Sequence, residues 1–164
     1  MVSVEQSREV LSGMKEAGVD FVVSVPDTNL ADLLTLLEQD GEVAHVPVGR
    51  EEEGIGVCVG AYLGGKRPAM LMQNAGLLNS CNALTTTGMQ FGIPLLLIVY
   101  YAGDLGDTAF HTLGIVTEPV LQGLGIKYAV ARDPADVRRQ IAEAATSAQA
   151  SKRPVALLLA RSVL

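Results

Sequence analysis

An acidic triplet followed by regularly spaced glycines offers the clearest chemistry in this chain. Four residues recur at the helical repeat and share one ridge: Glu52, Gly56, Gly60 and Gly64. Glycine inside a helix costs about 1 kcal/mol relative to alanine, so such a run needs a packing or functional reason. The spacing predicts a carboxylate at the head of a smooth groove that another backbone can approach. We therefore expect Glu52 to be a buried acid, shielded from water and held against a ligand at an interface between chains.

The acidic triplet and the glycines that follow it have two simpler interpretations. Acids at a helix start are favoured by the macrodipole, at about 0.3–1 kcal/mol each, which suffices to explain Glu51 and Glu53. Residues 54–60 also resemble a loose dinucleotide-binding fingerprint. Its glycines, however, lie inside the helix, and acids precede them where a pyrophosphate requires positive potential. We therefore reject dinucleotide binding and retain a special role for Glu52.

The remaining pattern alternates short apolar runs with amphipathic segments. The expected strands span 21–25, 43–48, 69–73, 95–100, 127–131 and 155–160, and the expected helices 4–17, 28–39, 51–64, 78–91, 113–124 and 134–149. Several strands are apolar throughout, as when helices cover both faces of a parallel sheet. We predict an α/β fold of three layers, α/β/α, with a six-stranded and mainly parallel sheet, formed by residues 1–164 as a single domain.

Ligands of open α/β sheets bind beyond the carboxyl ends of the strands. Besides the acidic triplet, three polar segments are expected there, at 26–29, 73–79 and 101–112. In the first, Pro26, Asp27, Thr28 and Asn29 serve either as helix caps or as free polar groups.

The other two segments are equally open to two interpretations. Gln73, Asn74, Gly76 and Asn79 fit either turn chemistry or contact with a ligand. His111 either donates a proton or bonds within its loop.

Composition excludes several classes of protein. With 49% hydrophobic and 18% charged residues the chain is not a disordered segment, and a net charge of −6 without a basic cluster argues against nucleic-acid binding. No apolar run reaches membrane-spanning length, and the N-terminus lacks a secretory signal pattern. Cys58 and Cys81 lack metal-ligand spacing, so we expect reduced thiols, a cytoplasmic location and no metal ligands from this chain.

With these residues in hand, the chain resembles the pyrimidine-binding (PYR) domain of thiamine diphosphate enzymes. More narrowly, it resembles the alpha subunits of sulfopyruvate decarboxylases and the matching region of phosphonopyruvate decarboxylases. The resemblance is sharpest at residues 25–30, 50–56, 60–68 and 72–76. In this family the cofactor glutamate lies ten residues before the tyrosine of a Gly-Ala-Tyr segment, and that tyrosine is Tyr62 here. The resemblance and the spacing argument therefore select the same residue, Glu52.

The resemblance implies a thiamine diphosphate-dependent 2-keto acid decarboxylase that releases CO2 and an aldehyde. The cofactor accepts the electrons of the departing carboxylate, while the protein supplies orientation and electrostatics. By position, the resemblance assigns catalytic roles to Glu52, Asp27 and His111. It implies cofactor contacts for Glu52 and for Pro26, Thr28, Gln73, Asn74, Gly76 and Asn79.

The Gly-Asp-Gly motif with which this superfamily binds diphosphate and Mg²⁺ is missing; residues 103–105 read Gly-Asp-Leu. A beta subunit is therefore expected to supply the diphosphate and Mg²⁺ site, in a hetero-oligomer of at least two alpha and two beta chains. Two alternatives remain open: a thiamine diphosphate-dependent carboligase or acyl-transfer subunit, and a non-catalytic, flavodoxin-like binding module. Whether the substrate tail is a sulfonate or a phosphonate also stays open, with helix N-termini, Arg50 or cations of the partner as its candidate binding groups.

Overall fold

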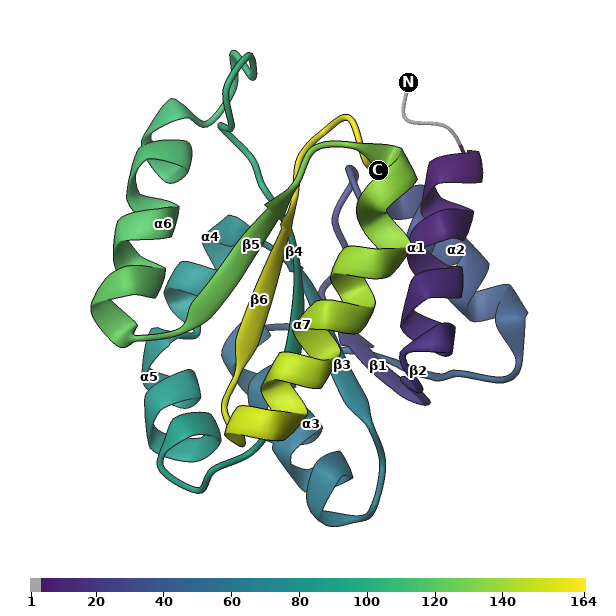
Figure 1. Cartoon of the computed structure of the whole chain (residues 1–164), viewed down its shortest axis with the longest axis vertical. Helices are drawn as coiled ribbons and strands as arrows, with labels where there is room; N and C mark the ends of the chain where they lie inside the picture. The colour runs from purple at the N-terminus through teal and green to yellow at the C-terminus, as the bar shows by residue number, and fades with distance from the viewer. Residues whose placement is uncertain (1–3) are drawn as a thin grey trace.

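The structure, a computed structural model, describes residues 4–164 and is built on one parallel sheet. In chain order its strands are β1 (Phe21–Ser24), β2 (Ala44–Pro47), β3 (Pro68–Gln73), β4 (Leu96–Tyr100), β5 (Lys127–Ala131) and β6 (Val155–Leu159). They lie in the order β2-β1-β3-β4-β6-β5, and each neighbouring pair is parallel (Figure 1). Each strand ends within one residue of its predicted bounds, which confirms the six-stranded α/β fold.

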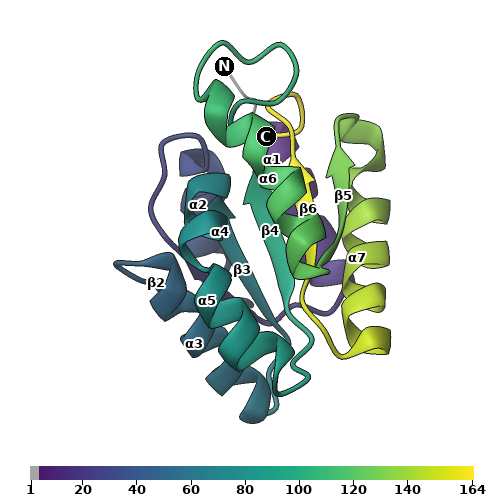
Figure 2. The ribbon, with the colours of Figure 1, turned by 90° about the vertical axis from the view of Figure 1, so that its left-hand side faces the viewer.

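Helices cover both faces of the sheet, as predicted. One face carries α1 (Val4–Glu16), α2 (Ala31–Asp40) and α7 (Val137–Ser151), which follows the short 3-10 helix η2 (Pro134–Asp136). The other carries α3 (Glu51–Leu63), α4 (Asn74–Asn79), α5 (Cys81–Ala83), the π-helix η1 (Leu84–Met89) and α6 (His111–Leu124), grouped together in Figure 2. The central strands are buried on both faces because successive side chains point to opposite sides: Ile98 joins one apolar cluster and Val99 the other.

The segment predicted as one helix over 78–91 is interrupted. It begins earlier, at Asn74, and continues through α5 into the π-helix η1. Each of Thr85, Thr86 and Thr87 donates its hydroxyl to a carbonyl four residues earlier. Such bonds compete for the acceptors of the regular helical ladder, which explains the wider turn.

Two further helix bounds differ from expectation. The helix expected from residue 28 starts at Ala31, and its N-cap, Leu30, makes no side-chain cap hydrogen bond. The loop expected to run through residue 112 ends two residues earlier, because α6 begins at His111. No helix in the described part of the chain is long and apolar enough to cross a bilayer.

Candidate active site

The predicted acid lies on the uncovered side of α3. Ile55 and Cys58 are fully buried against the sheet, whereas Glu52, Gly56 and Gly60 are exposed. A β-carbon added at Gly56 or Gly60 would meet nothing within 4 Å. The predicted ridge therefore exists, and within residues 4–164 no other segment covers it.

The carboxylate of Glu52 remains accessible at the head of this ridge. Its side chain is 44% exposed, and its Oε1 lies 3.1 Å from Nη2 of Arg50. An ion pair this exposed contributes little stability, so the pair with Arg50 leaves the carboxylate of Glu52 available to a ligand. Its position in the first turn of α3 also suits a negative charge, because the amide groups of that turn point toward it.

The other glycine of this helix has a different purpose. Gly54 faces the sheet, where an added β-carbon would lie 2.7 Å from Cε of Met70 and 3.2 Å from Cγ1 of Val23. The absence of a side chain lets α3 approach β1 and β3 closely. Gly54 thus sets the distance between α3, which carries Glu52, and the two strands.

Asp27 and Gln73, predicted from separate segments, are brought together at the ends of β1 and β3. Gln73 donates its Nε2 to Oδ2 of Asp27 over 3.1 Å. Oδ1 of Asp27 accepts from the backbone N–H of Asn29 at 2.7 Å and from its Nδ2 at 3.1 Å. Asp27 therefore caps its own turn rather than helix α2, and both carboxylate oxygens are held in a defined orientation. Pro26 and Thr28, on either side, are exposed.

The structure places the side chain of Asn74 inside the protein. Its side chain is fully buried and donates Nδ2 to the carbonyl of Ala102 at 2.8 Å and to Oγ1 of Thr117 at 2.9 Å. The amide thereby joins the start of α4 to the end of β4 and to α6, and it does not face the exposed edge of the sheet. Its Oδ1 has no hydrogen-bond partner. The neighbouring Asn79 is exposed.

His111 is exposed at the first position of α6. It follows Phe110, a non-glycine residue with a φ of 58°. The base of the loop before it closes tightly, because a β-carbon at Gly103 would lie 2.8 Å from the backbone N of Gly114. Within residues 4–164, no hydrogen bond joins His111 or Glu52 to the pair formed by Asp27 and Gln73.

Asp107 fixes the shape of the same loop. Its carboxylate accepts from the backbone N–H of Gly103 and of Ala109, each at 3.0 Å. These two bonds hold the pKa of Asp107 below its usual range, and the nearby Arg161 and His111 lower it further. The loop before His111 is thus anchored by a carboxylate that stays ionised.

A hydrogen-bonded acid anchors α6 to the sheet behind this loop. Glu118 accepts from the hydroxyls of Tyr101 and Tyr128, both at 2.9 Å. Burial, followed by these contacts with Glu118, raises the pKa of Tyr101 well above its usual range. Both phenols therefore remain donors at neutral pH, and α6 is held in place with His111 at its start.

Two features of the carboxyl edge were missed by sequence reasoning. Arg161 lies two residues after the end of β6 and lines two cavities at this edge, of about 360 and 340 Å³. The second feature is Tyr100, the last residue of β4. Its pKa is raised chiefly by burial, and the charges on Asp107, Arg161 and Asp27 also act on its phenol. The signal for Arg161 was a cation directly after the last apolar run.

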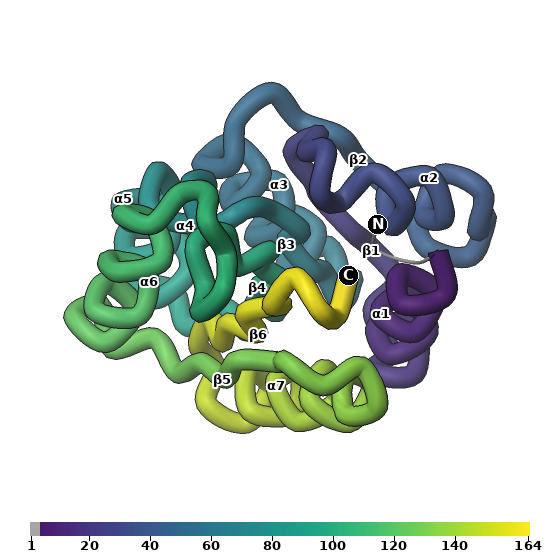
Figure 3. Tube along the Cα trace, turned by 90° about the horizontal axis from the view of Figure 1, so that it is seen from above, coloured from purple at the N-terminus to yellow at the C-terminus, as the bar shows by residue number. Residues whose placement is uncertain are grey.

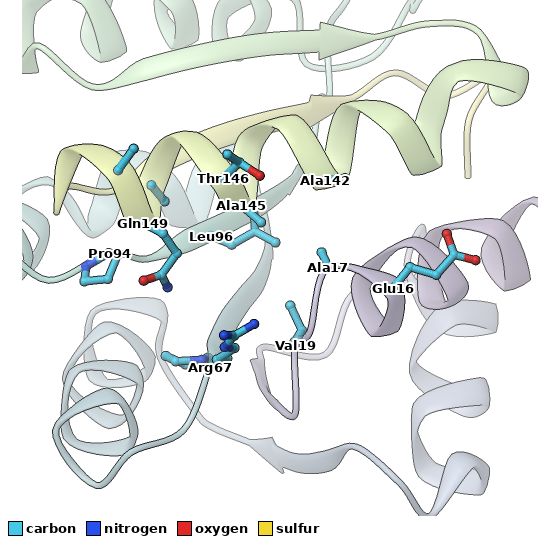
Figure 4. A pocket seen from close by; sticks show the side chains of 13 residues that line it. Glu16, Ala17, Val19, Arg67, Pro94, Leu96, Ala142, Ala145, Thr146 and Gln149 are labelled. Carbon is cyan, nitrogen blue, oxygen red and sulfur yellow. The ribbon is translucent and has the colours of Figure 1, made fainter.

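A cavity of about 550 Å³ lies at the opposite edge of the sheet. It is lined by Arg67 and Pro94, at the amino ends of β3 and β4, and by one side of α7 (Figure 4). None of the predicted site residues lines it. Within the described residues there is also no cluster of three or more His, Cys, Asp or Glu side chains that could hold a metal ion.

A parallel sheet with polar groups at its carboxyl edge and an accessible acid beside it defines a ligand-binding α/β domain. The sequence profile of the family described as thiamine pyrophosphate enzyme, N-terminal TPP binding domain, matches residues 6–111. The chain belongs to this family, which confirms the predicted membership.

The chain is also similar to individual proteins over most of its length. The chain is 41% identical over 160 residues to sulfopyruvate decarboxylase subunit alpha of Methanothermobacter thermautotrophicus, covering 96% of this chain and 97% of that protein. It is 28% identical over 131 residues to phosphonopyruvate decarboxylase of Streptomyces viridochromogenes, covering 78% and 33%. Among solved structures, 2-oxoglutarate:ferredoxin oxidoreductase of Magnetococcus marinus has a TM-score of 0.73 at 18% identity, over 96% of this chain and 29% of that one. This last likeness shows a common fold.

Proposed function

We propose that this chain is the alpha subunit of a two-chain, thiamine diphosphate-dependent decarboxylase of sulfopyruvate or phosphonopyruvate. The observation that carries the proposal is the accessible carboxylate of Glu52 at the head of an uncovered glycine ridge. The relatives named sulfopyruvate decarboxylase subunit alpha support the substrate class and the requirement for a second chain. Residues 1–164 would form one PYR-type domain, in the cytoplasm, where both free thiols stay reduced.

The residues of this chain fit one half of the cofactor. An exposed acid with open space behind it suits a flat aminopyrimidine ring that approaches from a neighbouring chain. For the other half, residues 103–105 read Gly-Asp-Leu instead of the Gly-Asp-Gly with which the superfamily binds diphosphate and Mg²⁺. The beta subunit would therefore hold the diphosphate and Mg²⁺, in an assembly of at least two alpha and two beta chains.

The surface beside the ridge also suits a partner chain. Leu63, at the end of α3, is 73% exposed, and Phe91, which follows η1, is 68% exposed. α3 and η1 pack against each other, so these side chains belong to neighbouring elements. Covering them would bury apolar surface, which stabilises an interface by about 25 cal/mol per Å².

In the mechanism, thiamine diphosphate would supply the electron sink for the departing carboxylate. Glu52 would hold a proton between its carboxylate and the pyrimidine nitrogen N1′, an interaction that strengthens when the beta chain excludes water. Asp27, oriented by Gln73 and Asn29, would deliver a proton to the product carbon, and His111 would assist from the start of α6.

Further residues would complete the site around these acids. Pro26, Thr28, Gln73 and Asn79 would line the cofactor, as would the backbone at Gly76. Asn74 would act indirectly, because its two hydrogen bonds stabilise the turn that follows Gln73.

The test is to co-express this chain with its beta partner and to measure CO2 release from sulfopyruvate, phosphonopyruvate and pyruvate. Glu52→Gln should lower kcat at least about 100-fold, as expected for a lost proton-transfer group. Because Glu52 is exposed and its ion pair with Arg50 is weak, the variant should lose at most about 1 kcal/mol of unfolding free energy. Asp27→Asn and His111→Ala should each reduce turnover, and full activity in either one would remove that residue from the mechanism.

Two controls separate this function from its alternatives. The isolated alpha chain should show no turnover, so robust activity without beta would contradict the proposal. Product analysis with an added aldehyde distinguishes decarboxylation from carboligation, since a carboligase would yield the joined product.

A further inference from the structure

Three arginines lie at the carboxyl edge of the sheet, and they differ in their partners. Arg50 pairs with Glu52 at 3.1 Å. Arg132 donates Nε and Nη2 to the two carboxylate oxygens of Asp104, at 3.0 and 2.7 Å. Arg161 is exposed and has no ion-pair partner among residues 4–164, although Asp32, Asp104 and Asp107 line the same two cavities. It is therefore the cation of this edge that remains available to an external anion.

The backbone that carries Arg161 is firmly placed. After β6 the chain turns back across the carboxyl edge toward β1 and α1 (Figure 3). The carbonyl of Ser162 accepts from Nε2 of Gln6 at 2.8 Å, and its hydroxyl donates to the carbonyl of Arg132 at 2.7 Å. Val163 and Leu164 are buried in the core. Arg161 thus extends from a pinned turn rather than from a loose chain end.

This turn brings Arg161 near the segment that holds Asp27. One cavity of about 360 Å³ is lined jointly by Arg161, Ser162, Thr28 and Asn29, although their strands, β6 and β1, are not neighbours in the sheet. Asn29 is in turn bonded to Asp27. The charges on Asp27 and Arg161 also both act on the phenol of Tyr100, whose pKa is raised chiefly by burial. A small molecule in this cavity contacts both Arg161 and Asn29, the residue whose backbone N–H is bonded to Asp27.

We propose that Arg161 binds the sulfonate or phosphonate oxygens of the substrate, while the reacting carbon faces Asp27. This inference rests on the decarboxylase function proposed above and assigns one residue to its specificity. A guanidinium presents two parallel N–H groups that match two oxygens of a tetrahedral anion. Thr28, at the wall of the shared cavity, adds a hydroxyl donor. Pyruvate, which lacks the tail, gains nothing from Arg161.

The experiment compares Arg161→Ala and Arg161→Lys with the parent in the complete alpha–beta enzyme. For the substrate with the matching tail, Arg161→Ala should raise KM about 10- to 100-fold, the loss expected for a hydrogen-bonded charge. Arg161→Lys should give an intermediate KM, because the point charge of an ammonium group replaces the two parallel N–H groups of the guanidinium. For pyruvate, kcat/KM should stay within about twofold. Sulfopyruvate and phosphonopyruvate are assayed in parallel, and the larger loss identifies the tail.

An equilibrium measurement and a control complete the design. Calorimetric binding of 3-sulfopropanoate and 3-phosphonopropanoate to the holoenzyme should weaken in Arg161→Ala by the same factor as KM. Arg153→Ala, an exposed arginine that follows α7, should leave every value unchanged.

The outcomes separate this inference from the function on which it rests. If the parent enzyme decarboxylates neither tailed substrate, the proposed function fails. If the parent is active and Arg161→Ala affects all three substrates equally, or none of them, only the role of Arg161 is overturned. Urea unfolding of each variant identifies a loss that comes from misfolding, and Arg161→Lys then provides the decisive comparison.

Discussion

The side chain of Glu51 lies directly against the backbone of Gly76. A β-carbon added at Gly76 would overlap Cγ and Cδ of Glu51 and would come within 2.5 Å of Oε1. This contact joins the first turn of α3 to the first turn of α4, and so joins the element carrying Glu52 to the element that follows Gln73. The glycine in the predicted amide turn therefore has a packing reason within this chain.

Gly76→Ala should displace Glu51 and loosen the junction between α3 and α4. We expect the isolated chain to lose about 1–3 kcal/mol of unfolding free energy, the usual cost of overpacking. The measurement is urea unfolding of four proteins: the parent, Gly76→Ala, Glu51→Ala and the double variant. Because the clash is with the Glu51 side chain, alanine at 76 should cost clearly less in the Glu51→Ala background. Additive costs would contradict the contact.

Alanine substitutions of the glycines on the α3 ridge should raise the stability of the isolated chain, whereas Gly76→Ala lowers it. Neither Gly56 nor Gly60 has an atom within 4 Å of an added β-carbon in this chain. Alanine at either position should therefore stabilise the isolated chain by about 0.5–1 kcal/mol, through helix propensity alone. If the ridge receives the beta subunit, the same substitutions should weaken association at least tenfold in sedimentation or calorimetry.

Gly123→Ala provides the matched control for the ridge. Gly123 is also an exposed helical glycine with open space around it, but it lies on α6. It should gain stability without changing association. Full binding by Gly56→Ala and Gly60→Ala would instead place the interface elsewhere.

Much of the fold could be predicted because a doubly covered parallel sheet leaves a simple pattern. Strands such as β4 and β6 are apolar at every position since both of their faces are buried. The placement of Glu52 and Ile55 on different faces of α3 followed from the helical repeat alone.

What escaped prediction depends on contacts between distant segments. For Asn74 the sequence leaves turn chemistry and ligand contact open, and only the distant carbonyl of Ala102 and hydroxyl of Thr117 show that its side chain is held in the core. Arg161 gains its position only because the chain end folds back over the sheet. The π-helical turn at 84–89 follows from hydroxyl bonds that intrinsic helix propensity does not describe.

The two thiols should differ sharply in reactivity. Cys58 is fully buried, and burial raises its pKa to about 12, so about one thiol in 10⁴ is ionised at pH 8. Cys81 is half-buried, and its pKa is raised less. In the folded chain iodoacetamide should label Cys81 first, and Cys58 only as fast as the chain unfolds. Mass spectrometry of timed samples checks the order, with both sites labelled in 6 M guanidinium as the control. Prompt labelling of Cys58 in the native chain would refute its burial.

Asp107 should make the stability of the chain depend on acid. Its folded pKa is depressed by the N–H groups of Gly103 and Ala109, so below neutral pH the unfolded chain binds the proton more readily. The stabilisation is therefore complete above the unfolded pKa of about 3.9 and is lost as pH falls through the lower, folded value. Asp107→Asn should cost about 1 kcal/mol at pH 7, since it removes the charge from two hydrogen bonds, and progressively less below about pH 4. Urea unfolding from pH 7 to pH 3 measures this difference, with Glu38→Gln, an exposed acid on α2, as the control. A difference that stays constant across the range would show that the carboxylate does not hold the loop before His111 through its charge.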